Sequence, residues 1–190
     1  MNQNDKCIVA VVGMPGTGKS TVVDMLVKKY HMPYIHFGGI TMEEMRRRGL
    51  EETQANEKKI RQELRKHHGM DAYATLSVPK IKDMLKENDV VLIDGLYSWS
   101  EYIYLREVDL AKISLITIIS MRKNRYDRLK KREYRPLDEK EAEKRDFAEI
   151  STLEKGGPIA LCDYYILNDN TVEKLEENVY NLVKNLLKIV

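Results

Sequence analysis

The chain contains five short apolar runs, which are separated by longer segments in which polar residues recur. Most of these runs are rich in β-branched residues and free of charge, which is typical of strands buried on both faces of a parallel sheet. We therefore expect strands at Cys7 to Val12, Pro33 to Phe37, Asp89 to Asp94, Ser114 to Ser120 and Tyr164 to Leu167.

Segments with helical periodicity fill the intervals between the runs. Helices are expected from Lys19 to Tyr30 and, capped by Thr171, from there to Ile189. The region from Thr41 to Glu87 is also helical in pattern, with breaks expected at Gly49, Gly69 and Pro79. The charged stretch from Met121 to Glu154 favours helix and precedes a loop at Gly156-Gly157-Pro158. This alternation predicts an α/β fold, a five-stranded parallel sheet with helices on both faces.

Length and composition restrict the possible functions. A chain of 190 residues suits a single domain, 1–190, and its net charge of +2 gives no general reason to expect a nucleic-acid partner. The polar start lacks a signal-peptide pattern, and no apolar run approaches the ~20 residues of a membrane span. We expect a cytoplasmic protein, monomeric or dimeric, with Cys7 and Cys162 as buried thiols.

A phosphate-binding motif follows the first expected strand. Gly13-Met14-Pro15-Gly16-Thr17-Gly18-Lys19-Ser20 fits G-x-x-x-x-G-K-[ST] and lies directly before a helix. In such a loop the amides converge on a β-phosphate, the lysine reaches the β- and γ-phosphates, and the serine hydroxyl ligates Mg²⁺. The pattern predicts an ATP site with Mg²⁺ bound at Ser20. Nucleotide contacts are expected from Gly13, Pro15, Gly16, Thr17, Gly18, Lys19, Ser20 and Thr21.

Asp94 ends the third expected strand, at the edge of the sheet where ligands gather. Its carboxylate can hold the water shell of Mg²⁺ or accept a proton from an attacking hydroxyl. A turn aspartate before Gly95 is the plain alternative, and the nearby phosphate motif favours a catalytic or metal-binding role for Asp94.

An arginine-rich stretch follows the fourth expected strand. Arg125, Arg128 and Arg132 are three and four residues apart and should share one helical face. Guanidinium groups neutralise the charge that develops on a phosphoryl group in transfer. We expect catalytic contributions from Lys19, Asp94, Arg128, Arg132 and Arg135, whereas the neighbouring lysines fit a solvated helix face.

Several of these segments resemble the nucleoside monophosphate kinases, adenylate kinase among them. The resemblance rests on the phosphate motif, the Asp89–Gly95 segment (DVVLIDG) and the Asp127–Arg132 segment (DRLKKR), and looks closest to the adenylate-kinase-related proteins of archaea. Dephospho-coenzyme A kinase is a more distant match. The resemblance implies a three-layer P-loop NTPase fold, a helical acceptor-side insert at about 38–88 and an arginine-rich lid at about 122–150. It also implies that Arg128 stacks on adenine, that Arg132 reaches phosphates, and that Arg135 and Arg145 are lid arginines.

Three positions depart from that family in the acceptor-binding segments, and the first is Gly39, which stands where the family has an aspartate. Met42 stands where the family has the arginine that grips the acceptor phosphate, and Tyr97 replaces a second arginine. Neither side chain offers a bidentate charged contact. The resemblance still favours phosphoryl transfer from ATP to a nucleoside monophosphate or similar nucleotide. A hydroxyl acceptor, of the dephospho-coenzyme A or nucleoside type, and a slow ATPase switch remain alternatives. Compensating cations could come from Arg46, Arg61, Arg65 and Lys66.

Overall fold

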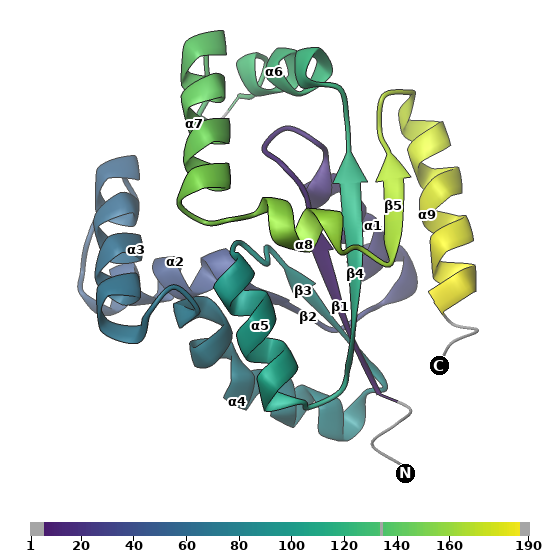
Figure 1. Ribbon diagram of the computed structural model, residues 1–190, viewed down its shortest axis with the longest axis horizontal. Helices are drawn as coiled ribbons and strands as arrows, with labels where there is room; N and C mark the ends of the chain where they lie inside the picture. The colour runs from purple at the N-terminus through teal and green to yellow at the C-terminus, as the bar shows by residue number, and fades with distance from the viewer. Residues whose placement is uncertain (1–5, 134, 187–190) are drawn as a thin grey trace.

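A parallel sheet of five strands forms the centre of the computed structural model, which describes residues 6–133 and 135–186 (Figure 1). The strands are β1 (Cys7–Val12), β2 (Tyr34–His36), β3 (Val90–Asp94), β4 (Lys112–Ile119) and β5 (Tyr164–Leu167), in the order β2-β3-β1-β4-β5. Because β1 lies between β3 and β4, the strand order reverses at its carboxyl end, where ligands of such sheets bind. The five predicted strands and their parallel arrangement are confirmed, while the polar start and the helix end at Ile189 lie outside the described residues.

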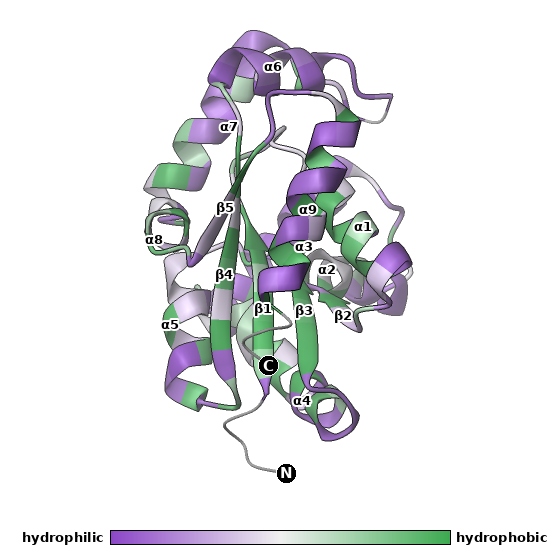
Figure 2. Ribbon diagram, turned by 90° about the vertical axis from the view of Figure 1, so that its right-hand side faces the viewer, coloured by the Kyte–Doolittle hydropathy of each residue, from purple (hydrophilic) through white to green (hydrophobic). Residues whose placement is uncertain are grey.

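Helices cover both faces of this sheet, as the sequence predicts. α1 (Lys19–Tyr30) and α9 (Val172–Leu186) cover one face, and α4 (Ala72–Glu87) and α5 (Trp99–Val108) cover the other (Figure 1). Alternate residues of β1 enter the two cores, Ile8 on the α4–α5 side and Val9 on the α1–α9 side. Figure 2 shows largely apolar strands between helices that mix polar and apolar residues. Among the described residues, no helix has the length and apolar character needed to cross a membrane.

The region from Thr41 to Glu87 folds into three helices, α2 (Phe37–Arg47), α3 (Gln54–His68) and α4. The breaks expected at Gly49 and Gly69 are confirmed, with φ of 64° and 87°, a conformation in which glycine avoids steric strain. The break expected at Pro79 is wrong, because α4 continues through it. Proline removes one helical hydrogen bond, and Pro79 itself lies at an exposed position of α4.

Two helices carry the arginine-rich region, α6 (Arg122–Lys130) and α7 (Glu139–Ser151), and the short helix α8 (Gly156–Ala160) follows it. A capping box between Asp138 and Glu141 starts α7. The prediction of a loop at Gly156-Gly157-Pro158 is wrong, since these residues form the first turn of α8. Proline is tolerated there because the first amides of a helix have no helical acceptor. Figure 1 places α6 above the carboxyl ends of β1 and β4, over the loop that follows β1.

Candidate phosphate-binding site

The loop of residues 13–20 connects β1 to α1 and packs tightly against two other segments. Gly16 has a φ of 80°, and a Cβ atom added there would lie 2.6 Å from the carbonyl oxygen of Arg125 in α6. Gly18 has a φ of 94°, and its absent side chain leaves room for the amide of Asn168, which follows β5. Both positions therefore need glycine for conformation and for space.

The amides of this loop are available to an anion. Within residues 16–20 of the described chain, one main-chain amide has a protein acceptor, Thr17, which donates to the Met14 carbonyl at 3.4 Å. The remaining amides include those of the first turn of α1, where the helix dipole favours negative charge. An anion at this position would receive several hydrogen bonds that the protein itself does not use.

The Lys19 ammonium lies over this loop. Its Nζ atom donates to the carbonyl oxygens of Gly13 at 2.8 Å and Met14 at 3.0 Å. Burial, followed by the positive charge of Lys155, lowers the pKa of Lys19 to about 7. A bound polyphosphate would supply the negative charge that this environment lacks and would favour the protonated form.

Asp94 lies beside a histidine that the sequence reasoning did not single out. β2 and β3 are paired so that His36 is opposite Asp94, and His36 Nδ1 lies 2.7 Å from Asp94 Oδ2. The Nε2 atom of His36 and the hydroxyl of Tyr97 both approach Gly38: a Cβ atom placed there would be 2.5 Å and 3.0 Å from them. The ends of β2 and β3 thus bring a carboxylate, an imidazole and a phenol together.

Arg125 and Asp146 form a buried ion pair that connects α6, α7 and the phosphate loop. Arg125 Nη2 donates to Asp146 Oδ2 at 2.6 Å, and Arg125 Nη1 donates to Asp146 Oδ1 at 3.0 Å. The same Nη1 atom also donates to the Pro15 carbonyl at 2.9 Å. Arg125 therefore positions the loop and is not free to meet a nucleotide.

Arg128 joins the phosphate loop to the segment after β5. Its guanidinium donates to the Asn168 carbonyl at 2.7 Å, to Ser120 Oγ at 3.1 Å and to the Gly16 carbonyl at 3.4 Å. Asn168 Nδ2 in turn donates to the Thr17 carbonyl at 2.8 Å. The structure brings Arg128 to the loop, and its predicted stacking on adenine stays a prediction.

The remaining candidate arginines lie on different elements. The expectation that Arg132 shares a helical face with Arg125 and Arg128 is wrong. α6 ends at Lys130, and Arg132 follows it in an exposed position. Arg135 donates to Glu57 and so connects the segment between α6 and α7 to α3. Arg145 Nε donates to Glu149 Oε1 within α7 at 3.2 Å. The predicted catalytic roles of Arg132 and Arg135 are untested by this arrangement.

Aromatic and cationic side chains surround Tyr97, where the resemblance places an acceptor arginine. Its ring lies edge-on to Tyr73 with centroids 6.0 Å apart, and the Arg65 guanidinium lies 5.5 Å from the Tyr73 ring centroid. The Lys155 ammonium is 5.4 Å from the Tyr97 ring centroid. Burial raises the pKa of the Tyr97 phenol. Met42 is partly buried against the apolar core, and its thioether side chain carries no charge.

His36, Lys155 and Asn168 are the site residues that sequence reasoning missed. His36 was detectable, because a polar residue at the carboxyl end of one parallel strand faces its counterpart on the next. Lys155 has no such signal, since it directly precedes a short helix that the sequence pattern does not predict.

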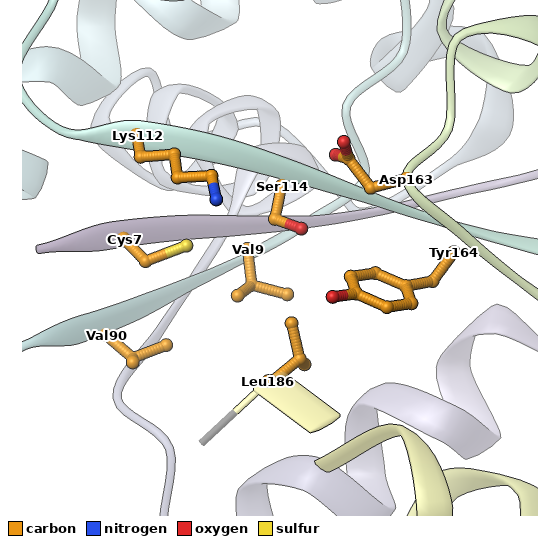
Figure 3. A pocket seen from close by; sticks show the side chains of 8 residues that line it. All are labelled: Cys7, Val9, Val90, Lys112, Ser114, Asp163, Tyr164 and Leu186. Carbon is orange, nitrogen blue, oxygen red and sulfur yellow. The ribbon is translucent and has the colours of Figure 1, made fainter. Parts of the chain in front are cut away.

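A small hollow lies at the opposite end of the sheet. Figure 3 shows the side chains that line it: Cys7, Val9, Val90, Lys112, Ser114, Asp163, Tyr164 and Leu186. Its carboxylate, Asp163, accepts a hydrogen bond from the Leu115 amide at 2.7 Å and thereby helps to fix β4. Cys7 is buried as expected, whereas Cys162 is only partly buried, and both are free thiols. Nothing in this hollow suggests catalysis.

Comparison with known proteins identifies the family of this chain and supports its fold. A family model described as an AAA domain matches residues 9–149. A UPF0200 protein of Thermococcus onnurineus is 36% identical over 183 residues, which is 95% of this chain and 98% of the relative. A putative kinase from Chloroflexus aurantiacus has a similar fold, with a TM-score of 0.66, 13% identity and full coverage of both chains. Shikimate kinase from Aquifex aeolicus gives a TM-score of 0.56 at 18% identity and covers 95% of this chain and 98% of its own.

These findings confirm the expected P-loop kinase-like fold and the resemblance to archaeal proteins. The two solved structures are too distant in sequence to indicate more than the fold. On the family match and the relative, the chain belongs to the AAA-domain family of P-loop proteins and, within it, to the UPF0200 family.

Proposed function

We propose that this protein is an ATP- and Mg²⁺-dependent phosphotransferase that phosphorylates a hydroxyl group of a small molecule. The observation that carries the proposal is the pairing of two unlike sites at one edge of the sheet. On one side, the loop of residues 13–20 presents amides without protein acceptors, together with Lys19. On the other side, Asp94 and His36 lie 2.7 Å apart at the ends of β3 and β2.

The donor side would hold ATP through the loop amides and Lys19. Ser20 is exposed in the first turn of α1, where its hydroxyl is free to bind Mg²⁺. Mg²⁺ would keep waters and phosphate oxygens as most of its other ligands. When bound, Mg²⁺ supplies charge neutralisation to the β- and γ-phosphate oxygens.

Asp94 would act on the acceptor side as the base. The acceptor hydroxyl oxygen would attack the γ-phosphorus, its proton would pass to the Asp94 carboxylate, and the bond to the β–γ bridging oxygen would break to release ADP. Asp94 holding a water of the Mg²⁺ shell is the other role open to it. Its contact with His36 favours the role of base, because His36 lies beside Tyr97 on the acceptor side.

A nucleoside monophosphate acceptor is the second candidate. Met42 and Tyr97 argue against a bidentate grip on a phosphate, which only guanidinium groups provide well. Arg65 favours this candidate, since it lies against Tyr73 beside Tyr97 and could reach an acceptor phosphate. Of the other predicted compensating cations, Arg61 is paired with Glu57, and Arg46 and Lys66 are exposed.

The proposal is tested by ADP formation from ATP–Mg²⁺ with nucleosides, dephospho-coenzyme A, small hydroxy acids and nucleoside monophosphates. We expect transfer to a hydroxyl compound, and a loss in kcat of about 10²- to 10⁴-fold in Asp94→Asn. Preferential turnover of nucleoside monophosphates would contradict the hydroxyl acceptor and support the second candidate. Bare hydrolysis with every acceptor, stimulated by a protein partner, would instead identify an ATPase switch.

A further inference from the structure

Lys155 is a buried cation that the scheme above leaves without a role. It precedes α8 and is 2% exposed. Burying an ammonium group is strongly unfavourable unless a counter-charge accompanies it. The Glu149 carboxylate of α7 provides that charge through a direct ion pair. Apolar residues at both positions would avoid the desolvation cost of the two charges. A functional role for the pair would explain why the charges are present.

Lys155 and Lys19 belong to one group of interacting charges. Its ammonium is the largest charge effect on Lys19, and Arg145 adds a third cation that acts on the same lysine. Glu149 and Asp94 are the acidic groups that oppose these effects on Lys19. Glu101 is a further acidic group on which Lys155 acts, and burial raises its pKa to about 7, so ionised carboxylates do not fully balance the three cations beside the phosphate loop.

Lys155 also faces the acceptor side. Its Nζ atom lies 5.4 Å from the centroid of the Tyr97 ring, a cation–π geometry. The main-chain amide of Tyr97 donates a hydrogen bond to Glu101 Oε2 at 2.6 Å. Lys155, which lies between α7 and α8, therefore places a positive charge beside Tyr97, whose own side chain is neutral.

We propose that Lys155 is a catalytic residue that contacts the phosphoryl group as it passes between donor and acceptor. This inference rests on the proposed function. In the ligand-free protein Glu149 holds the ammonium in place. When the anion arrives, Lys155 donates hydrogen bonds to its oxygens and stays protonated, so no proton or covalent bond is transferred to it. Lys19 meets the same group from the phosphate loop.

A purely structural ion pair is the alternative, and a double variant separates the two. Lys155→Met removes the charge, keeps a side chain of similar length and leaves Glu149 without its buried lysine. Lys155→Met/Glu149→Gln removes both charges, which relieves that imbalance. Lys144→Met, on the exposed side of α7, is the matched control for the loss of one lysine.

Phosphate binding is measured directly, so that the result does not depend on identifying the acceptor. Trp99 is the single tryptophan of the chain, and its ring packs against Gly157, close to Lys155. Its fluorescence should therefore report the titration of the ADP–Mg²⁺ complex with inorganic phosphate. Because charge-assisted hydrogen bonds are strong, we expect about 10- to 100-fold weaker phosphate binding in Lys155→Met and in the double variant. Lys144→Met should match the wild type.

The acceptor assay adds a second measurement. Lys155→Met and the double variant should both lose kcat while their KM for ATP stays within about twofold, because the contact forms during transfer. Restoration of phosphate affinity and kcat by the double variant would reduce Lys155 to a partner of Glu149 and overturn the proposal, as would an unchanged Lys155→Met. Should the wild type phosphorylate no acceptor, the proposed function fails, and the phosphate titration alone still decides the role of Lys155.

Discussion

The ion pair between Arg125 and Asp146 provides the sharpest test of how α6 and α7 are attached to the phosphate loop. Asp146 accepts two hydrogen bonds from Arg125, at 2.6 and 3.0 Å, and a third from the Tyr126 hydroxyl at 3.1 Å. Both side chains of the pair are at most 10% exposed. The substitution Asp146→Asn removes the negative charge and leaves the arginine buried beside a neutral amide.

Removing one partner of a buried ion pair costs about 3–5 kcal/mol, because the other charge stays desolvated. Asparagine keeps one acceptor oxygen, so we expect a loss of about 3 kcal/mol in the free energy of unfolding. Urea denaturation followed by circular dichroism measures this loss. In a chain of this length, it should also lower Tm by about 6–12 °C.

The double variant Arg125→Met/Asp146→Leu is the control. Apolar replacement of a buried pair is often close to neutral, so its stability should approach that of the wild type. It also removes the hydrogen bond from Arg125 to the Pro15 carbonyl, so ATP affinity measured by calorimetry should stay reduced. If Asp146→Asn lost less than about 1 kcal/mol, the pair would behave as a solvated one and the reasoning would be refuted.

Three further predictions concern other parts of the site. Arg128→Ala should weaken ATP binding by about tenfold or more and leave acceptor KM nearly unchanged, as measured by calorimetry and kinetics; equal effects on both ligands would remove Arg128 from the nucleotide site. Met42→Arg should raise kcat/KM for nucleoside monophosphates if a missing guanidinium limits their use, and no gain would show that such an acceptor is gripped elsewhere. Burial raises the pKa of Glu101 to about 7, so the folded protein binds more protons than the unfolded chain between about pH 4.5 and 7. Stability should therefore fall by up to about 3 kcal/mol as pH rises through this window, and urea denaturation of Glu101→Gln should show a flatter dependence.

The strands and the phosphate loop could be predicted because their signals are local. A β-branched run followed by Gly13 to Ser20 specifies a strand, a tight turn and a helix start in consecutive residues. The closing helix was equally clear: Leu175, Val179 and Leu182 recur at helical spacing and are buried in the structure. Thr171 caps it as expected, accepting a hydrogen bond from the Lys174 amide.

The roles of the arginines depend on distant partners and could not be predicted in the same way. The sequence places Arg125, Arg128 and Arg132 together, yet Asp146, Asn168 and the end of α6 give each a different environment. The short helix α8 escapes prediction because its Gly-Gly-Pro start is typical of loops. Its position depends on packing, in which Pro158 is buried and Gly157 lies against Trp99.

The central claim is that the main-chain amides of residues 13–20 bind the phosphates of ATP. A crystal structure with a non-hydrolysable ATP analogue and Mg²⁺ tests it directly. The account predicts β-phosphate oxygens within hydrogen-bond distance of these amides and of Lys19 Nζ, and Mg²⁺ next to the Ser20 hydroxyl. An analogue bound elsewhere, with the Lys19 ammonium still on the Gly13 and Met14 carbonyl oxygens, would contradict it.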